Sequence, residues 1–164
     1  MALSGAIRLA LDTTMTSALD LSTSQDVLSL VFPLTITDGV GANQSNRHFS
    51  DRRALAASAS EDVDLSGALT DAFGASLALT KVKAVIVINR SGNGAGISVR
   101  GAASNGVANF MPGAHVLADG GAFATFDFTA AGWTVAPGTG DKITVTNLSG
   151  SVGATYDIYV IGSQ

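Results

Sequence analysis

The chain has 164 residues, of which 46% are apolar and 13% are charged. Charged residues are therefore about half as frequent as the roughly 25% of an ordinary globular domain. This composition argues against an intrinsically disordered chain, because disorder requires low hydrophobicity and high charge. The net charge of −4, with scattered cations, disfavours nucleic-acid binding, which needs cations to neutralise phosphates.

No cysteine is present, which excludes disulfides, thiolate catalysis and thiolate metal sites. No apolar run approaches the roughly 20 residues that span a bilayer. The N-terminus also lacks the charged start and continuous apolar core of a signal peptide. We therefore expect a soluble chain with no membrane partner. Its surface, poor in charge, suits packing against a neighbour.

The first 25 residues differ from the rest of the chain. Ile7, Leu9 and Leu11 form a short apolar stripe, and residues 13–25 are rich in Ser and Thr. We predict an N-terminal arm or strand over residues 1–25 that serves attachment more than folding. Pairing with another chain and pairing within the domain's own sheet are two equal alternatives, since a lone strand is not stable without a sheet.

Residues 26–164 are predicted to form a β-sandwich. Residues 26–37 should be an edge or bulged strand, because Pro33 lacks a ladder donor. Residues 52–65 predict another strand. Residues 66–74 predict one helical turn, capped by Ser66 and ended by Gly74.

Two hairpins are predicted farther along the chain. Residues 82–89 are β-branched and apolar on both faces, as in a central strand, and residues 97–100 follow after a glycine-rich turn. Residues 142–146 and 154–161 predict the second hairpin. Between the two, Phe126 and Phe128 are assigned to the core.

Short strands at regular intervals, with glycine-rich turns and no long amphipathic helix, are typical of an all-β protein. We predict an antiparallel β-sandwich of the jelly-roll type with an N-terminal arm or extra strand.

Catalytic and metal-binding patterns are missing from the sequence. His48 and His115 are the only histidines, too few for a multi-histidine site. Glu61, Asp62 and Asp64 lack EF-hand spacing and predict a solvated face. We expect no catalytic residue, no cofactor and no metal.

Two other patterns also favour structural roles. The glycine-rich stretch 92–96 resembles a phosphate-binding loop, but a strand follows it where a helix is needed. Three Asn-x-Ser sequences, at Asn43, Asn89 and Asn147, are attributed to chance in a Ser-rich chain.

Possible partner contacts are the apolar stripe and a small group of arginines. Ile7, Leu9 and Leu11 could join another chain through strand addition. The planar guanidinium groups could bind carboxylates of a partner; the three arginines are Arg47, Arg52 and Arg53.

Residues 38–162 resemble small structural proteins of tailed bacteriophage virions. The resemblance depends on the order of common β patterns, which are DGVGANQ (38–44), SEDVDL (60–65), AFG (72–74), VKAVIVIN (82–89), GWTV (132–135) and ATYDIYVIG (154–162). It implies a jelly-roll domain in the virion, without catalytic residues.

Within that family, the first hypothesis is a capsid cement or decoration protein. Such a protein sits on the outer capsid surface, commonly as a homotrimer, and bridges major capsid subunits; it would be made in the host cytoplasm. The alternative is a tail or host-recognition component that binds a receptor or carbohydrate. Sugar platforms usually need exposed aromatic rings, whereas Trp133, Tyr156 and Tyr159 are expected to pack in the core.

Overall fold

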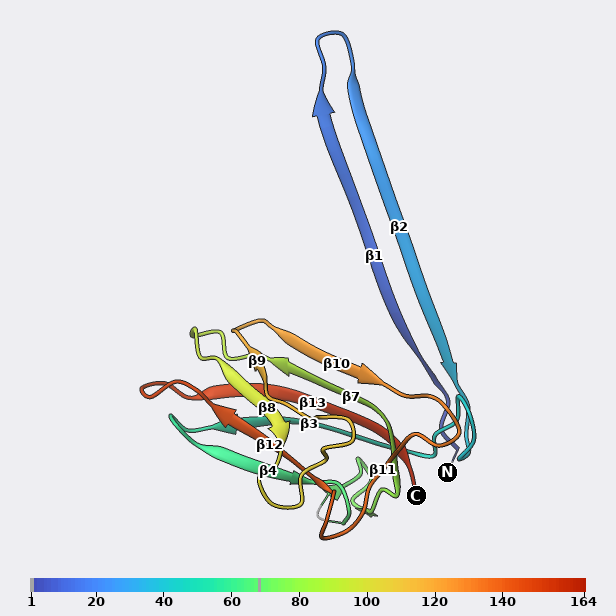
Figure 1. Ribbon diagram of the computed structural model, residues 1–164, viewed down its shortest axis with the longest axis vertical. Coiled ribbons are helices and arrows are strands. Elements are labelled where there is room, and N and C mark those ends of the chain that lie inside the picture. The colour runs from blue at the N-terminus through green and yellow to red at the C-terminus, as the bar shows by residue number, and fades with distance from the viewer. Residues whose placement is uncertain (1, 68) are drawn as a thin grey trace.

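The computed structural model describes residues 2–67 and 69–164 and consists of a β-sandwich and a long arm (Figure 1). One sheet has the order β10-β7-β13-β3, and the other has the order β4-β12-β8-β9. The strands of the first sheet are β10 (Ala122–Phe126), β7 (Lys81–Asn89), β13 (Ala154–Ser163) and β3 (Arg47–Leu55), with β11 (Trp133–Thr134) also pairing with β7. The strands of the second sheet are β4 (Ser60–Asp64), β12 (Lys142–Asn147), β8 (Ile97–Gly101) and β9 (His115–Leu117).

The core lies between the two sheets. Val85 and Val160 from the first sheet and Val99 and Val145 from the second are fully buried in one cluster. All strand pairs within the sheets are antiparallel. The predicted all-β antiparallel sandwich is confirmed.

Both predicted hairpins are wrong. β7 and β8 lie in different sheets, and so do β12 and β13. The loops 90–96 and 148–153 carry the chain across the core from one sheet to the other. Alternation of apolar and polar residues shows that a strand buries one face. It does not show which strand lies beside it, and here strands that are neighbours in the sequence lie in different sheets.

Two smaller predictions also differ from the structure. Residues 52–65 form the end of β3 and the separate strand β4, because Ser58 turns the chain with a φ of 58°. In place of a helical turn at 66–74, the structure has the short pair β5 (Leu69–Thr70) and β6 (Ser76–Leu77). The carboxylate of Asp71 accepts the N–H groups of two turn residues and closes this pair. Residue 68 of the predicted turn lies outside the described residues.

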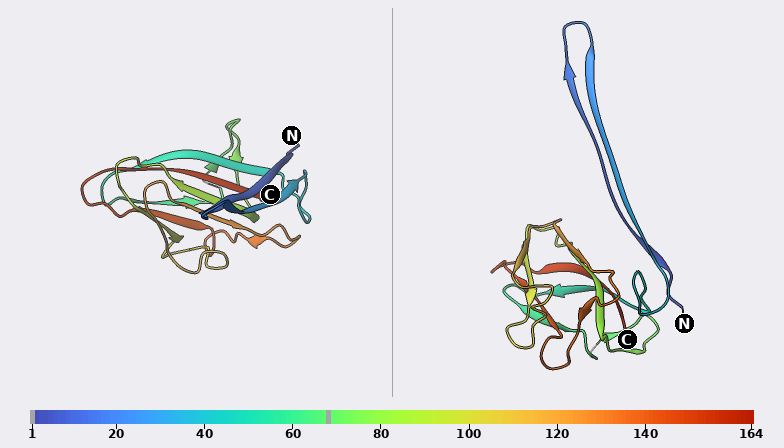
Figure 2. Two further views of the ribbon diagram at one scale, coloured as in Figure 1. Left: turned by 90° about the horizontal axis from the view of Figure 1, so that it is seen from above. Right: turned by 45° about the vertical axis from the view of Figure 1, so that its right-hand side comes forward.

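The arm is a hairpin of β1 (Gly5–Ala18) and β2 (Thr23–Ile36) that stands away from the sandwich (Figures 1 and 2). The two strands pair along their whole length of 14 residues each. At about 3.3 Å per residue, the arm is roughly 46 Å long. It continues to Ile36, so the expected division at residue 25 falls inside the hairpin.

The partner of the N-terminal strand is therefore β2, so the strand pairs within its own chain, but in a separate hairpin and not in a sheet of the sandwich. Residues 26–37 do form an edge strand, but it is an edge of the arm and not of the sandwich. A two-stranded ribbon consists of two edge strands. Pro33, opposite Arg8, is tolerated in it because an edge strand offers positions where no ladder N–H is needed.

Candidate interaction surfaces

The arm has one apolar face. Residues directly opposite in an antiparallel pair point to the same side of the ribbon. Leu9 faces Phe32, Leu11 faces Leu30, and Thr13 faces Leu28. The "apolar arm face" accordingly consists of Ile7, Leu9, Leu11, Met15, Leu28, Leu30, Phe32 and Leu34.

The opposite side of the arm is more polar. Arg8, Asp12, Thr14, Thr16, Gln25 and Ser29 lie there with Ala10, Val27, Val31 and Pro33. The arm is thus amphipathic across both strands, with the period of two that a half-buried ribbon requires.

The sandwich leaves most of the apolar arm face uncovered. Leu9 is 61% exposed, Leu30 54% and Phe32 58%. Toward the tip, Met15 is 72% exposed and Leu21, in the turn, is 99% exposed. A contiguous apolar surface of this kind indicates a site of contact with another molecule.

Among the residues that the structure describes, only the base of the arm packs on the sandwich. Ile36 is buried with Ala84 of β7 and with Phe128, and Ile7, Leu34, Leu3 and Ile161 pack around them. We call this group the base cluster. Ala84 and Ile161 lie opposite each other on the side of the first sheet that faces away from the core. The apolar arm face therefore meets the outer face of this sheet.

Hydrogen bonds from the loop after the arm hold the base in place. The N–H of Thr37 donates to the carbonyl of Asn43 at 3.1 Å, and the N–H of Asn43 donates to the carbonyl of Phe128 at 2.9 Å. The N–H of Leu3 donates to the carboxylate of Asp38 at 3.0 Å. The direction in which the arm leaves the sandwich is thus set by several bonds.

The outer face of the first sheet is apolar next to the base cluster. Ala124, Ile86, Tyr159 and Ser50 lie side by side across the four strands. Phe126 occupies the neighbouring row and is 41% exposed, so its assignment to the core is wrong, although Phe128 is buried. We call this surface, made of Ile86, Ile88, Ala122, Ala124, Phe126 and Tyr159, the outer sheet face.

The far end of the outer sheet face is charged. Asp157 is buried and accepts two hydrogen bonds from Arg52, at 2.6 and 3.0 Å, and a third from Arg90 at 3.0 Å. The hydrogen bond from Arg52 is the main cause that lowers the pKa of Asp157 below its ordinary value. Both arginines are more than half exposed. This end of the face therefore presents positive charge to solvent.

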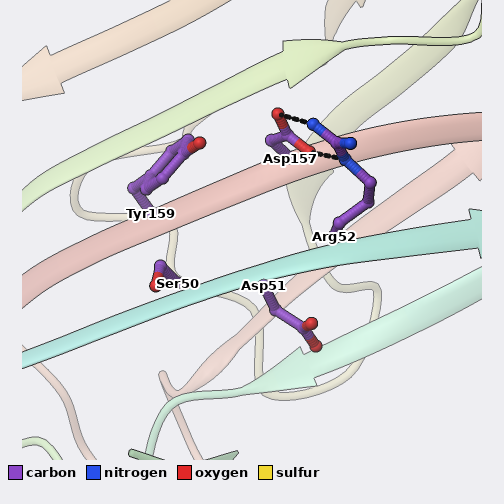
Figure 3. Close-up of a pocket in the computed structure, with 5 residues that line it drawn as sticks. All are labelled: Ser50, Asp51, Arg52, Asp157 and Tyr159. Carbon is purple, nitrogen blue, oxygen red and sulfur yellow. Dashed lines mark hydrogen bonds and ion pairs between the residues drawn. The ribbon is translucent and has the colours of Figure 1, made fainter. Parts of the chain in front are cut away.

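A shallow hollow of about 340 Å³ lies beside this ion pair, lined by Ser50, Asp51, Arg52, Asp157 and Tyr159 (Figure 3). Tyr159 is 38% exposed, contrary to the expectation that it packs in the core. Tyr156 is fully buried, as expected, and Trp133 stacks on Phe110 at 4.9 Å between ring centroids.

The structure separates the proposed contact residues into two groups. Ile7, Leu9 and Leu11 share the apolar arm face, with Ile7 half-buried in the base cluster. The arginines lie on β3 and bind groups of the chain itself. Arg47 donates to Gln164, Arg52 to Asp157, and Arg53 to Asp51 and Glu61.

Sequence reasoning missed five of the eight residues of the apolar arm face, Met15 of β1 and four residues of β2. Leu28, Leu30, Phe32 and Leu34 lie on β2, which was assigned to the sandwich. Their alternation is visible in the sequence, and the turn at 19–22 separates two stripes of equal length. Outer-face residues such as Phe126 have no comparable signal, because only strand pairing places them together.

Among residues 2–67 and 69–164, no group of three or more His, Asp or Glu side chains is arranged to hold a metal ion. His48 lies exposed on β3, and His115 stacks on Phe123 at 4.1 Å between ring centroids. In the same described part of the chain, no helix has the length and apolar character to cross a membrane. No family model, curated protein or solved structure matches the chain.

Proposed function

We propose that this chain is a non-enzymatic structural protein of a tailed-bacteriophage virion, a cement or decoration protein that binds the outside of the capsid and bridges major capsid subunits. The observation that carries the proposal is the arm. Its apolar face extends along a ribbon of about 46 Å that the sandwich does not cover. A two-stranded ribbon is marginally stable in water by itself, so this face is suited to lie on another chain, and such assembly between chains is what a decoration protein present in many copies requires.

The strand order supports the jelly-roll type that the resemblance implies. Numbered along the chain, the eight main strands of the sandwich give the order 6-3-8-1 in one sheet and 2-7-4-5 in the other. A jelly roll consists of eight strands in two such sheets, connected as two Greek keys.

The proposed mechanical role depends on the surface area buried between proteins and on the number of linked copies that bind together. A protein that bridges capsid subunits adds buried surface across joints that internal pressure would separate. About 1,600 Å² is enough for a specific stable interface. We propose a homotrimer, because linked copies bind with an effective concentration that multiplies weak contacts.

A second candidate is a tail or host-recognition component. Tyr159, exposed beside the hollow and the arginines, offers an aromatic ring and polar groups on one surface. An exposed ring beside polar groups can bind a polar ligand. The sequence had instead indicated that the aromatic rings are buried, where no ligand could reach them.

Microscopy of virions tests the proposal. Particles are produced in host cells in which the chain carries an electron-dense label at Gln164, which is exposed. We expect label at regular positions on the capsid surface, and we expect particles made without the chain to release DNA at a lower temperature. Label on the tail, together with binding of the purified chain to host cells, would favour the second candidate. Virions without label would contradict both.

A further inference from the structure

The apolar arm face and the outer sheet face are two parts of one surface that stays open within a single copy. They meet at the base cluster, where Ile7 and Leu34 of the arm pack on Ala84 and Ile161 of the sheet. Beyond this contact the arm points away from the sheet (Figures 1 and 2). Each face is therefore available to a neighbour.

We propose that the arm of one copy lies with its apolar face on the outer sheet face of a second copy, so that each copy donates one arm and accepts one. The proposal rests on the homo-oligomer of the proposed function and specifies how its copies join. Such a head-to-tail contact closes into a ring when the rotation between copies allows it. In a ring of three copies, every apolar arm face lies on a sheet, and every outer sheet face is covered by an arm.

The distribution of charge favours the sheet of a second copy over its arm. The arm carries Arg8 against Asp12, Asp20 and Asp26, a net charge of −2. Asp26 lies on the apolar side, opposite Met15, near the tip. Two arms packed face to face in parallel would bring acidic tips together, and packed antiparallel they would place Asp26 on the apolar base of the other arm. The outer sheet face instead ends in the exposed guanidinium groups of Arg52 and Arg90.

The order of apolar and charged groups along the arm also matches their order along the outer sheet face. The arm runs from Ile7 and Leu9 at the base to Asp26 near the tip. The sheet runs from Phe126 beside the base cluster to Arg52 at the far end. An arm aligned with the strands of the accepting sheet would place apolar groups on apolar groups and a carboxylate near an arginine.

The area of each contact is small, so the ring depends on its closure. The outer sheet face extends along the five residues of β10, about 17 Å, and an arm two strands wide covers about 10 Å, so each contact covers on the order of 170 Å² of each partner. This is well below the roughly 600 Å² per partner of a stable pairwise interface, so each copy is held by its two contacts together and by closure of the ring. Packing of arm on arm would leave Phe126 and Tyr159 uncovered, whereas the exchange covers both faces at once.

The absence of cysteine allows a direct test with cross-linking. Leu30→Cys is made in one preparation and Ala124→Cys in another, and the two are mixed and treated with a short bis-maleimide. We expect a covalent dimer that contains one chain of each kind. Val31→Cys is the matched control, because Val31 is 57% exposed, close to the 54% of Leu30, but points to the other side of β2. It should cross-link much less, because its side chain faces away from the accepting sheet.

Other products would overturn the proposal. Cross-links mainly between two Leu30→Cys chains would show arm on arm. A further variant carries both cysteines in one chain. If this variant forms a cross-link within a single chain while it is a monomer, the arm folds onto its own sheet. Equal yields from Leu30→Cys and Val31→Cys would show chance collisions. Circular dichroism and cooperative unfolding of each variant confirm that it is folded.

Association of charged variants gives an independent measurement. By analytical ultracentrifugation, Leu30→Asp should weaken oligomerisation at least about tenfold and Val31→Asp much less. Oligomers that survive Leu30→Asp would contradict the exchange. Binding to virions is measured separately, so a chain that exchanges arms without binding virions would contradict the proposed function alone.

Discussion

Asn89 and Asn147 hold equivalent positions at the ends of β7 and β12, and each supports a loop that crosses between the sheets. The side-chain amide of Asn89 donates to the carbonyls of Ala95 and Leu117, at 2.8 and 3.1 Å. That of Asn147 donates to the carbonyls of Ala56 and Val152, at 2.9 and 2.8 Å.

The serine two residues after each asparagine completes the arrangement. The N–H of Ser91 donates to Oδ1 of Asn89, and the N–H of Ser149 donates to Oδ1 of Asn147. Two of the three Asn-x-Ser sequences, attributed above to chance, therefore have a structural role. Each closes the turn that begins a crossing loop.

Replacement of Asn147 by Ala should destabilise the sandwich. The residue is 1% exposed, and its loss leaves two carbonyls without their donor. The expected decrease in the free energy of unfolding is about 1–3 kcal/mol, measured by urea denaturation. Asn109→Ala is the control, because Asn109 is exposed and makes one side-chain bond. Equal effects of the two variants would contradict the supporting role of Asn147.

Acid should weaken the sandwich through Asp157. Its pKa is lowered in the folded chain, chiefly by Arg52 and also by Arg90, so its contribution is fully present above the unfolded pKa of about 3.9 and decreases as the pH falls through the folded value. The urea midpoint of the wild type should therefore fall steeply below about pH 4. Asp157→Asn should reduce stability at pH 7 and flatten this dependence. An unchanged acid slope in the variant would show that other carboxylates cause it.

Gly162→Ala should be strongly destabilising. Gly162 lies at the irregularity in the pairing of β13 with β7, and an added Cβ would stand 2.3 Å from the carbonyl oxygen of Lys81. The backbone would have to move, at a cost of about 3 kcal/mol. Gly113→Ala is a suitable control, since nothing lies within 4 Å of its added Cβ. A melting temperature within about 2 °C of wild type for Gly162→Ala would contradict this packing.

Shortening the arm should leave the sandwich folded. The base cluster is kept, and residues 10–31 are replaced by an Asn-Gly turn, which joins two antiparallel strands directly. Because the removed residues are exposed, the melting temperature should stay within a few degrees, while oligomerisation and virion binding are lost. A molten or insoluble product would show that the arm is needed for folding. This variant replaces a simple deletion of residues 2–24, which would leave β2 without its partner.

The sequence identified most strands because alternation and β-branched runs are local properties. β7, β12 and β13 fall close to the predicted ranges. Pairing depends on distant segments, which explains the two wrong hairpins. The arm shows the same difference between local pattern and pairing. The apolar stripe on β1 is visible in the sequence, whereas the stripe on β2 was predicted to belong to the sandwich.

The sequence by itself determined the all-β class, the apolar stripe of Ile7, Leu9 and Leu11, and the absence of thiolate chemistry, because each depends on residue type and short spacing. Only the tertiary structure decided that β2 completes the arm. It also decided that Phe126 and Tyr159 share an outer face, and that Arg52 binds Asp157. These relationships join residues far apart in the chain. Their geometry is set by how strands are ordered in the two sheets, which local patterns do not encode.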